Sequence, residues 1–310
     1  MTSRWTVHHG DVLDVLASMP DCSMDGALSD VPYGLGSRQP TVDELIAYLQ
    51  GSDLDTGGDF MGNSWSVPSV RVWRELFRVL RPGAHVLSFA GSRTGDLISI
   101  GMRAAGFEIR DTLQWIYAEG MPKSLDVSKA IDKRKGIGGS GDPARECAIT
   151  APATDDARHW DGFGTALKPA YEPIILARKP LDGTLVDNVR KWGVGALAID
   201  SCRIEYLNED DKAAAAAAAQ RLIRPSHGAG VGDFGLHGEN AAGSLPMFLA
   251  KQDLGRWPAN VCLDEIAAEM LDAQSGDRPG MSGGGKHRAD YGGGMFGAID
   301  STHTARNDHG

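Results

Sequence analysis

The feature that most constrains the fold is an alternation of short apolar strands and amphipathic helices through roughly the first 120 residues. Apolar residues recur at helical spacing in three segments, 12–19, 70–80 and 97–105. Short apolar runs mark four strands, 5–8, 24–29, 85–90 and 107–117. This order predicts an α/β fold with a doubly wound, mostly parallel sheet. In such a sheet, ligands bind beyond the carboxyl ends of the strands.

The pattern loosens after residue 124. The later segments predict a basic helix over 127–135, an irregular stretch over 136–165, a strand over 173–177, a helix over 185–192 and an alanine-rich helix at 213–219. Glycine triplets at 283–285 and 292–294 are typical of loops or disorder. We therefore predict a catalytic core over residues 1–180. A variable, irregular region with a glycine-rich, partly disordered end follows over 181–310.

The charge balance bounds the kind of partner. The chain has 41 acidic and 31 basic residues and a net charge of −10, which argues against a protein that coats nucleic acid by charge alone. A local basic groove remains possible. Its candidates are Lys123, Lys129, Lys133, Arg134 and Lys135, then Arg178, Lys179, Arg190 and Lys191. Solvated helix faces are an equally good interpretation of most of them.

The cysteines and the apolar runs exclude other classes of protein. Cys22, Cys147, Cys202 and Cys262 lie far apart and form no paired metal-binding motif, so no metal site is expected. No apolar run approaches the ~18 residues of a membrane span. The first residues lack the pattern of a signal peptide, and the expected location is the cytoplasm.

One tetrapeptide, Asp30-Val31-Pro32-Tyr33, follows a short apolar strand and has a specific chemical use. The lone pair of an exocyclic amino group on a base is delocalised into the ring. Two acceptors, the Asp30 carboxylate and the Val31 carbonyl, would draw that nitrogen towards sp³ geometry. Tyr33 offers a face on which an extruded base can stack, and Pro32 stiffens the turn. The alternative is an ordinary strand-to-turn junction, since these residue types are common in turns.

The neighbouring segments favour the functional interpretation. The tetrapeptide resembles the D-P-P-Y motif of the DNA adenine-N6 and cytosine-N4 methyltransferases. Other segments resemble this family in the expected order: His9–Leu13, Leu16–Asp21, Leu80–Ala84, Gly106–Asp111, Gly120–Ser124 and Leu167–Ile174, with a weaker match at Gly255–Asn260. The order is that of the phage-type members, in which the catalytic motif precedes the cofactor motif. The resemblance covers roughly residues 5 to 205.

The resemblance implies a Rossmann-like methyltransferase fold and transfer of a methyl group from S-adenosylmethionine to double-stranded DNA. It implies Asp30, Val31, Pro32 and Tyr33 as catalytic residues, and Asp11 and Asp30 as cofactor-binding residues. Aspartate at the head of the tetrapeptide favours adenine N6 over cytosine N4. Residues 136–165 and 205–250 are the candidates for the surface that recognises the DNA sequence.

Two departures from the family matter. Val31 stands where the family has proline, which keeps the backbone acceptor but loosens the turn. A glycine-rich cofactor loop of the type F-x-G-x-G is missing. Ser88–Thr94 imitates it, but Arg93 occupies the place of the second glycine, so we interpret this segment as a strand-to-helix turn beside the site.

Three interpretations follow from the missing loop. The chain is a working methyltransferase with an unrecognised cofactor pocket, the N-terminal part of a longer methyltransferase, or an inactive DNA-binding remnant. The missing loop favours the second, and the acidic charge disfavours the third. We therefore expect weak or no binding of S-adenosylmethionine by the 310-residue chain alone.

Overall fold

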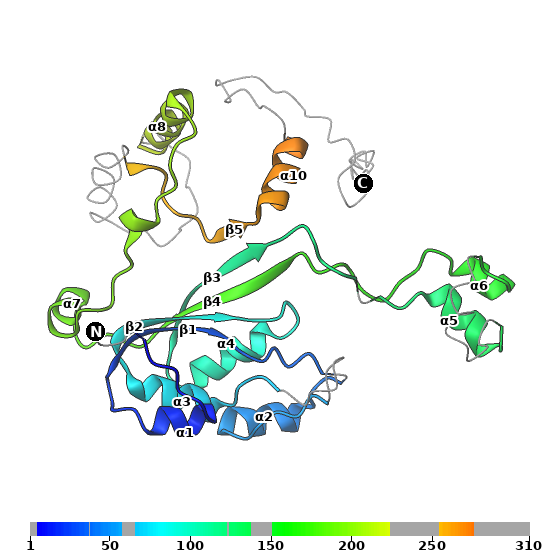
Figure 1. Cartoon of the computed structure of the whole chain (residues 1–310), viewed down its shortest axis with the longest axis horizontal. Helices are drawn as coiled ribbons and strands as arrows, with labels where there is room; N and C mark the ends of the chain where they lie inside the picture. The colour runs from blue at the N-terminus through cyan, green and yellow to red at the C-terminus, as the bar shows by residue number, and fades with distance from the viewer. Residues whose placement is uncertain are drawn as a thin grey trace, which may run out of the picture.

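A five-stranded mixed sheet forms the centre of the chain (Figure 1). The computed structural model describes residues 5–36, 38–57, 66–122, 124–137, 151–223 and 254–275. The strands are β1 (Met24–Asp30), β2 (Leu80–Phe89), β3 (Glu108–Ile116), β4 (Tyr171–Arg178) and β5 (Val261–Leu263), in the spatial order β1-β2-β4-β3-β5. β4 runs antiparallel to both β2 and β3, and the other four strands share one direction. The predicted α/β class is confirmed, and the sheet is mixed, with two parallel pairings (β1–β2 and β3–β5) and two antiparallel pairings (β2–β4 and β3–β4).

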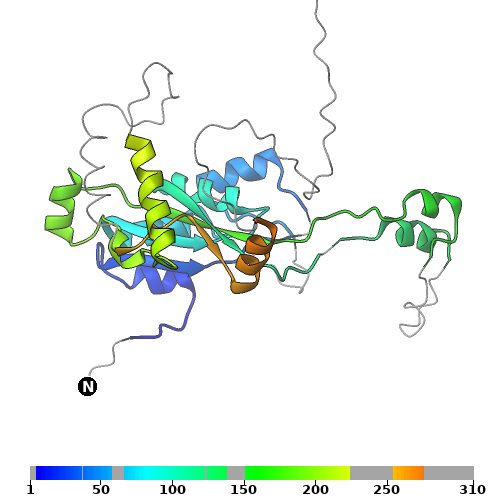
Figure 2. The ribbon, with the colours of Figure 1, turned by 90° about the horizontal axis from the view of Figure 1, so that it is seen from above.

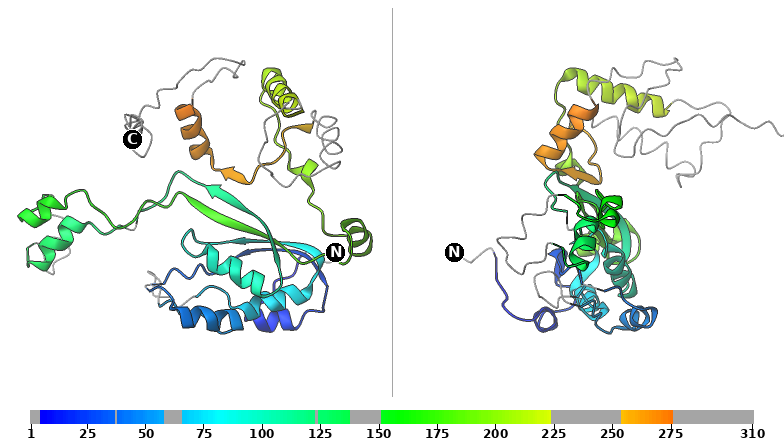
Figure 3. Two further views of the ribbon diagram at one scale, coloured as in Figure 1. Left: turned by 180° about the vertical axis from the view of Figure 1, so that it is seen from behind. Right: turned by 90° about the vertical axis from the view of Figure 1, so that its right-hand side faces the viewer.

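Four helices lie together on one side of this sheet (Figures 1 and 3). They are α1 (Val12–Ala17), α2 (Val42–Gln50), α3 (Val70–Val79) and α4 (Gly95–Ala104). α3 buries Val70, Trp73 and Val79 and contacts β2, while α4 packs against β3 and β4. The apolar spacing read from the sequence places α1, α3 and α4 correctly, because each has one apolar face that packs against its neighbours.

The two faces of the sheet are covered differently. Ala27, Val86 and Ala177 align across β1, β2 and β4, and all three belong to or pack on the hydrophobic core under the helices. The next row, on the opposite face, is Leu28, Leu87 and Leu176. Leu28 is 72% exposed, so the described residues leave the β1 end of that face open.

β1 is an edge strand in the part of the chain that the structure describes. It pairs with β2 alone, and its other edge has no strand beside it. The Ser29 hydroxyl, near the carboxyl end of the strand, is buried without a hydrogen-bond partner among the described residues. An uncovered apolar edge strand invites pairing with further polypeptide.

Two predictions about strands were wrong. Residues 5–8 form no strand, because no described strand lies beside them, and Trp5 and Val7 are largely exposed. β2 begins at Leu80 and not at the predicted residue 85, and it includes the Arg81-Pro82-Gly83 segment. The strand absorbs this segment as an irregularity, since Met24 pairs with Leu80 while Gly26 pairs with His85. Gly83 makes the irregularity possible with a positive φ of 82°.

A small helical pair, α5 (Val127–Arg134) and α6 (Asp155–His159), stands apart from the sheet at the end of an extended arm (Figures 1 and 2). The buried Asp132 carboxylate joins the two helices, because it accepts hydrogen bonds from the Ala153 amide and the Thr154 hydroxyl, each at 2.8 Å. The predicted irregular stretch over 136–165 therefore contains a helix. Residues 138–150 lie outside the described residues.

The later segments include α7 (Leu185–Trp192), a 3₁₀ turn (η2, Ile199–Cys202), α8 (Glu209–Ile223) and α10 (Glu265–Ser275). The alanine run at 213–219 lies within α8, as predicted. β5 pairs with β3, and Asn188 of α7 donates a hydrogen bond to the Pro82 carbonyl at 3.0 Å. Residues after 180 thus also pack on the core. The glycine triplets at 283–285 and 292–294 lie outside the described residues.

Candidate active site

The tetrapeptide Asp30–Tyr33 begins at the carboxyl end of β1, where the sequence places it. Asp30 pairs in register with Phe89 of β2, and its side chain is exposed. Val31 is partly buried and packs on the hydrophobic core. This packing restrains the turn at the position where the family has the first of its two prolines. Within the described residues no hydrogen bond ends on the Val31 carbonyl, which stays available as an acceptor.

Tyr33 is held at both ends. Its hydroxyl donates a hydrogen bond to Glu172 Oε2 at 3.0 Å, and its backbone carbonyl accepts one from the Thr94 hydroxyl at 2.5 Å. Burial raises the pKa of Tyr33 above its usual value, and the carboxylates of Glu172 and Asp30 raise it further. The hydroxyl therefore remains protonated, and the ring has a fixed place beside Asp30.

The turn from β2 to α4 supports the Tyr33 turn. A Cβ atom on Gly91 would lie 2.9 Å from Thr94 Oγ1 and 3.2 Å from Leu35 Cδ2, so only glycine allows the two turns to approach so closely. Thr94 precedes the first residue of α4, yet its hydroxyl bonds to Tyr33 instead of capping the helix. The interpretation of Ser88–Thr94 as a strand-to-helix turn is confirmed, and this turn lies beside Tyr33.

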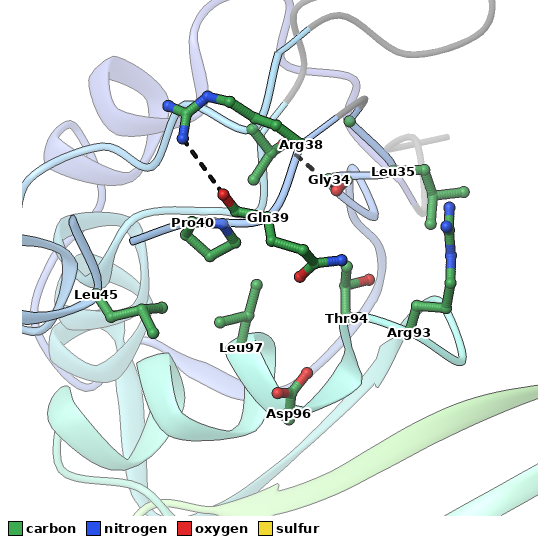
Figure 4. A pocket seen from close by; sticks show the side chains of 12 residues that line it. Gly34, Leu35, Arg38, Gln39, Pro40, Leu45, Arg93, Thr94, Asp96 and Leu97 are labelled. Carbon is green, nitrogen blue, oxygen red and sulfur yellow. Dashed lines mark hydrogen bonds between the residues drawn. The ribbon is translucent and has the colours of Figure 1, made fainter. Parts of the chain in front are cut away.

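A pocket lies next to this turn, between it, α2 and α4 (Figure 4). Its volume is about 160 Å³. Pro40, Leu45 and Leu97 form its apolar part, and Gln39, Thr94 and Asp96 its polar part. Arg93 reaches its rim with an exposed side chain that forms no ion pair in the described part of the chain.

Glu172 is the site residue that the sequence did not single out. It lies at the start of β4, 139 residues after Tyr33, opposite Trp115 of β3. The segment Leu167–Ile174 was recognised only as part of the family resemblance, and it carried no residue role. Its signal was an acidic residue directly before an apolar strand, which by itself is common.

The structure gives Asp11 a local role. Asp11 precedes α1, and its carboxylate accepts a hydrogen bond from the Leu13 amide at 2.8 Å, which caps the helix. No hydrogen bond or ion pair between described residues joins Asp11 to Asp30 or Tyr33. A role of Asp11 towards the cofactor stays a prediction.

Two of the predicted basic-groove residues serve the interior instead. Arg178 binds Glu108, with Nη2–Oε2 at 2.6 Å. Lys179 Nζ donates to the Phe77 and Leu80 carbonyls at the end of α3, at 2.8 and 2.7 Å. These two side chains are therefore not free for a nucleic acid.

The other candidates divide between two distant places. Lys191 of α7 pairs with Asp182, which precedes the helix, and its neighbour Arg190 is exposed. Lys129 pairs with Asp126, and Lys135 with Asp156, in the α5–α6 pair, where Lys133 and Arg134 are exposed. Lys123 lies outside the described residues.

The described residues contain no cluster of side chains suited to a metal ion. They also contain no helix long and apolar enough to cross a membrane.

Comparison with curated proteins finds one clear relative. Over 218 residues the chain is 24% identical to the type II methyltransferase M.HindIII of Haemophilus influenzae. The match covers 61% of this chain and 63% of that protein. The chain is a relative of a type II DNA methyltransferase. It spans less than two thirds of that relative's length. No protein-family model matches.

Solved structures give a weaker likeness. A protein proposed to be a DNA modification methylase, TTHA0409 of Thermus thermophilus, is 18% identical over 86% of this chain and 91% of its own, with a TM-score of 0.28. The cytosine-N4-specific PvuII DNA methyltransferase is 13% identical over 82% and 79%, with a TM-score of 0.30. Because these TM-scores are low, the fold assignment rests on the strands and helices of the chain itself.

Proposed function

We propose that this chain is the catalytic and DNA-contacting part of a DNA amino-methyltransferase that acts on adenine N6, with S-adenosylmethionine as the methyl donor. The observation that carries the proposal is the arrangement at the end of β1. An exposed Asp30 carboxylate, a Val31 carbonyl that no described residue donates to and an anchored aromatic ring lie within four consecutive residues. The relationship to a type II DNA methyltransferase supports it.

The proposed chemistry follows from these groups. Asp30 and the Val31 carbonyl accept hydrogen bonds from the two N–H groups of the exocyclic amine, which makes the nitrogen lone pair available for attack. Tyr33 stacks on the extruded base, a contact worth about 1–3 kcal/mol per base. The turn is rigid because Val31 packs on the core and Tyr33 is bonded to Thr94. Rigid acceptors need no reorganisation when the reaction begins.

The described residues fit only part of the proposed cofactor. Bound S-adenosylmethionine would supply the electrophilic methyl group next to Asp30. Its methionine part requires a glycine turn with open space, and the Gly91 turn has none, because Leu35, Thr94 and Tyr33 fill the space over it. We propose that the remaining cofactor contacts come from polypeptide beyond the described residues. The open edge and the exposed Leu28 of β1 are a suitable place for it.

The α5–α6 pair is the proposed DNA-contacting arm. β1 and β3 run in the same direction. The arm, which connects the end of β3 to the start of β4, therefore leaves the sheet at the same end of the strands as Asp30. Three basic side chains, Lys129, Lys133 and Arg134, are exposed on α5. Trp160 and Phe163 form an exposed edge-to-face pair at 5.1 Å beside it. Such residues contact phosphates and stack on bases.

The double variant Lys133→Glu/Arg134→Glu is expected to weaken DNA binding about tenfold at moderate salt and to lower the salt slope of log K by roughly one per lost phosphate contact. Fluorescence anisotropy with a labelled duplex at several salt concentrations measures both. The matched control is Arg190→Glu/Lys191→Glu on α7, at the opposite end of the molecule (Figure 1). Equal losses in both double variants would show that the arm has no special part in binding.

The proposed function is tested by identifying the methylated nucleoside that the protein produces. The 310-residue chain, and any longer form of it that the gene encodes, are incubated with DNA and labelled S-adenosylmethionine, and the nucleosides are identified. Labelled N6-methyladenine is the expected product, and calorimetric titration should show the cofactor binding more tightly to the longer polypeptide. N4-methylcytosine would support the alternative substrate. No labelled nucleoside from either length, with DNA binding intact, would support an inactive DNA-binding fragment.

A further inference from the structure

The backbone around Glu172 is fixed by hydrogen bonds that do not involve Tyr33. The next residue, Pro173, accepts a hydrogen bond from the Ala90 amide at 3.0 Å, which ties the start of β4 to the end of β2. On the other side, the Tyr117 amide donates to the Ala170 carbonyl at 3.0 Å. Both neighbouring strands therefore fix the backbone next to Glu172. Its side chain accepts the Tyr33 hydrogen bond from a rigid backbone position.

The Tyr33 hydroxyl has two carboxylates near it. One is Glu172, to which it donates at 3.0 Å. The other is Asp30, three residues before Tyr33, which also contributes to the raised pKa of the phenol. A phenol has one hydrogen to donate, so these two acceptors compete for it. An Asp30 oxygen that accepts the Tyr33 hydrogen is less available to an amino group of a base.

We infer that Glu172 is a positioning residue. It accepts the hydrogen bond from the Tyr33 hydroxyl, so that the Asp30 carboxylate stays free for the substrate amino group. The same hydrogen bond fixes the plane of the Tyr33 ring towards an extruded base. The inference rests on the proposed function for its consequence in catalysis. The hydrogen bond and its effect on Tyr33 are measurable without DNA or cofactor.

The removal of Glu172 has a specific expected consequence. In Glu172→Ala the hydroxyl turns to Asp30 as its remaining acceptor, and kcat falls roughly tenfold to a hundredfold, the range for a misplaced hydrogen bond to a charged group. The KM for DNA changes less, because the ring remains. Glu172→Gln keeps an acceptor oxygen of the same length and retains most of the activity.

A second substitution separates this role from a direct contact with the substrate. Tyr33→Phe removes the hydroxyl. No phenol hydrogen then competes with the substrate for Asp30, and Glu172 has no hydroxyl to bind. Tyr33→Phe alone should keep much of the activity, since the stacking face remains. The double variant Glu172→Ala/Tyr33→Phe should then be more active than Glu172→Ala alone and close to Tyr33→Phe. The second substitution is expected to restore activity to Glu172→Ala only if Glu172 acts through the Tyr33 hydroxyl.

The experiment measures kcat and KM for these four variants and the wild type, in the length of the protein that carries the activity. In parallel, NMR of tyrosine labelled at Cζ follows the Tyr33 resonance in the 310-residue chain, with Tyr33→Phe used for assignment. We expect this resonance to move in Glu172→Ala and to move less in Glu172→Gln. Circular dichroism and the Tm confirm that each variant folds.

Two results would overturn the inference: a double variant no more active than Glu172→Ala, or a Tyr33 resonance unchanged in Glu172→Ala. A wild-type protein that transfers no methyl group would instead overturn the proposed function, and with it the catalytic role of Glu172. In that case the NMR result still decides whether Glu172 holds the hydroxyl. The two failures are thus distinguishable.

Discussion

Asp30→Ala is expected to lower the rate of methyl transfer by at least about two powers of ten while the protein stays folded. The Asp30 carboxylate is one of the two acceptors that free the lone pair of the amino group, and no neighbouring side chain in the described chain can replace it. Glu172 is engaged by Tyr33. Asp30 is exposed and forms no ion pair with another described residue, so its loss opens no cavity in the core.

The measurement is single-turnover methyl transfer to DNA, in whichever length of the protein carries the activity. Asp30→Asn keeps one acceptor oxygen and should fall between the wild type and Asp30→Ala. Asp25→Ala is the matched control, because Asp25 is an exposed carboxylate on the same strand, where it pairs with Arg81. Near-normal turnover in Asp30→Ala would refute the proposed mechanism.

Trp73→Ala is expected to lower the free energy of unfolding by about 3–5 kcal/mol, the range for removal of a large buried aromatic side chain. Trp73 lies on the buried face of α3 and is 1% exposed. A Cβ atom on Gly101 of α4 would lie 3.2 Å from Trp73 Cδ1, which shows how closely the two helices pack around it. The cavity left by the substitution cannot close without moving both helices.

Urea denaturation followed by circular dichroism measures the change. The matched control is Trp160→Ala, because Trp160 is 42% exposed and lies in the α5–α6 pair, away from this core. Its midpoint of unfolding should stay near that of the wild type. Equal losses of stability in the two variants would mean that the α1–α4 layer is not the stabilising core.

Local patterns in the sequence were sufficient for α1, α3 and α4 and for the turn that begins at Asp30. The apolar spacing of 70–80 predicted α3 because the helical period places Val70 and Trp73 on one face. The position of Asp30–Tyr33 after an apolar run predicted a turn at a strand end, and β1 ends at Asp30. Residues 5–8 show the limit of such patterns, because a strand also needs a neighbour and none lies beside them in the described chain.

Contacts between distant segments could not be predicted in this way. The sequence by itself determined α1, α3, α4 and the strand before Asp30, because each depends on side chains a few positions apart. Only the tertiary structure decided that β4 lies antiparallel between β2 and β3. That placement brings Glu172 to Tyr33 and turns Lys179 towards the end of α3. The physical reason is that strand order and direction depend on pairing across the whole sheet, which no local spacing encodes.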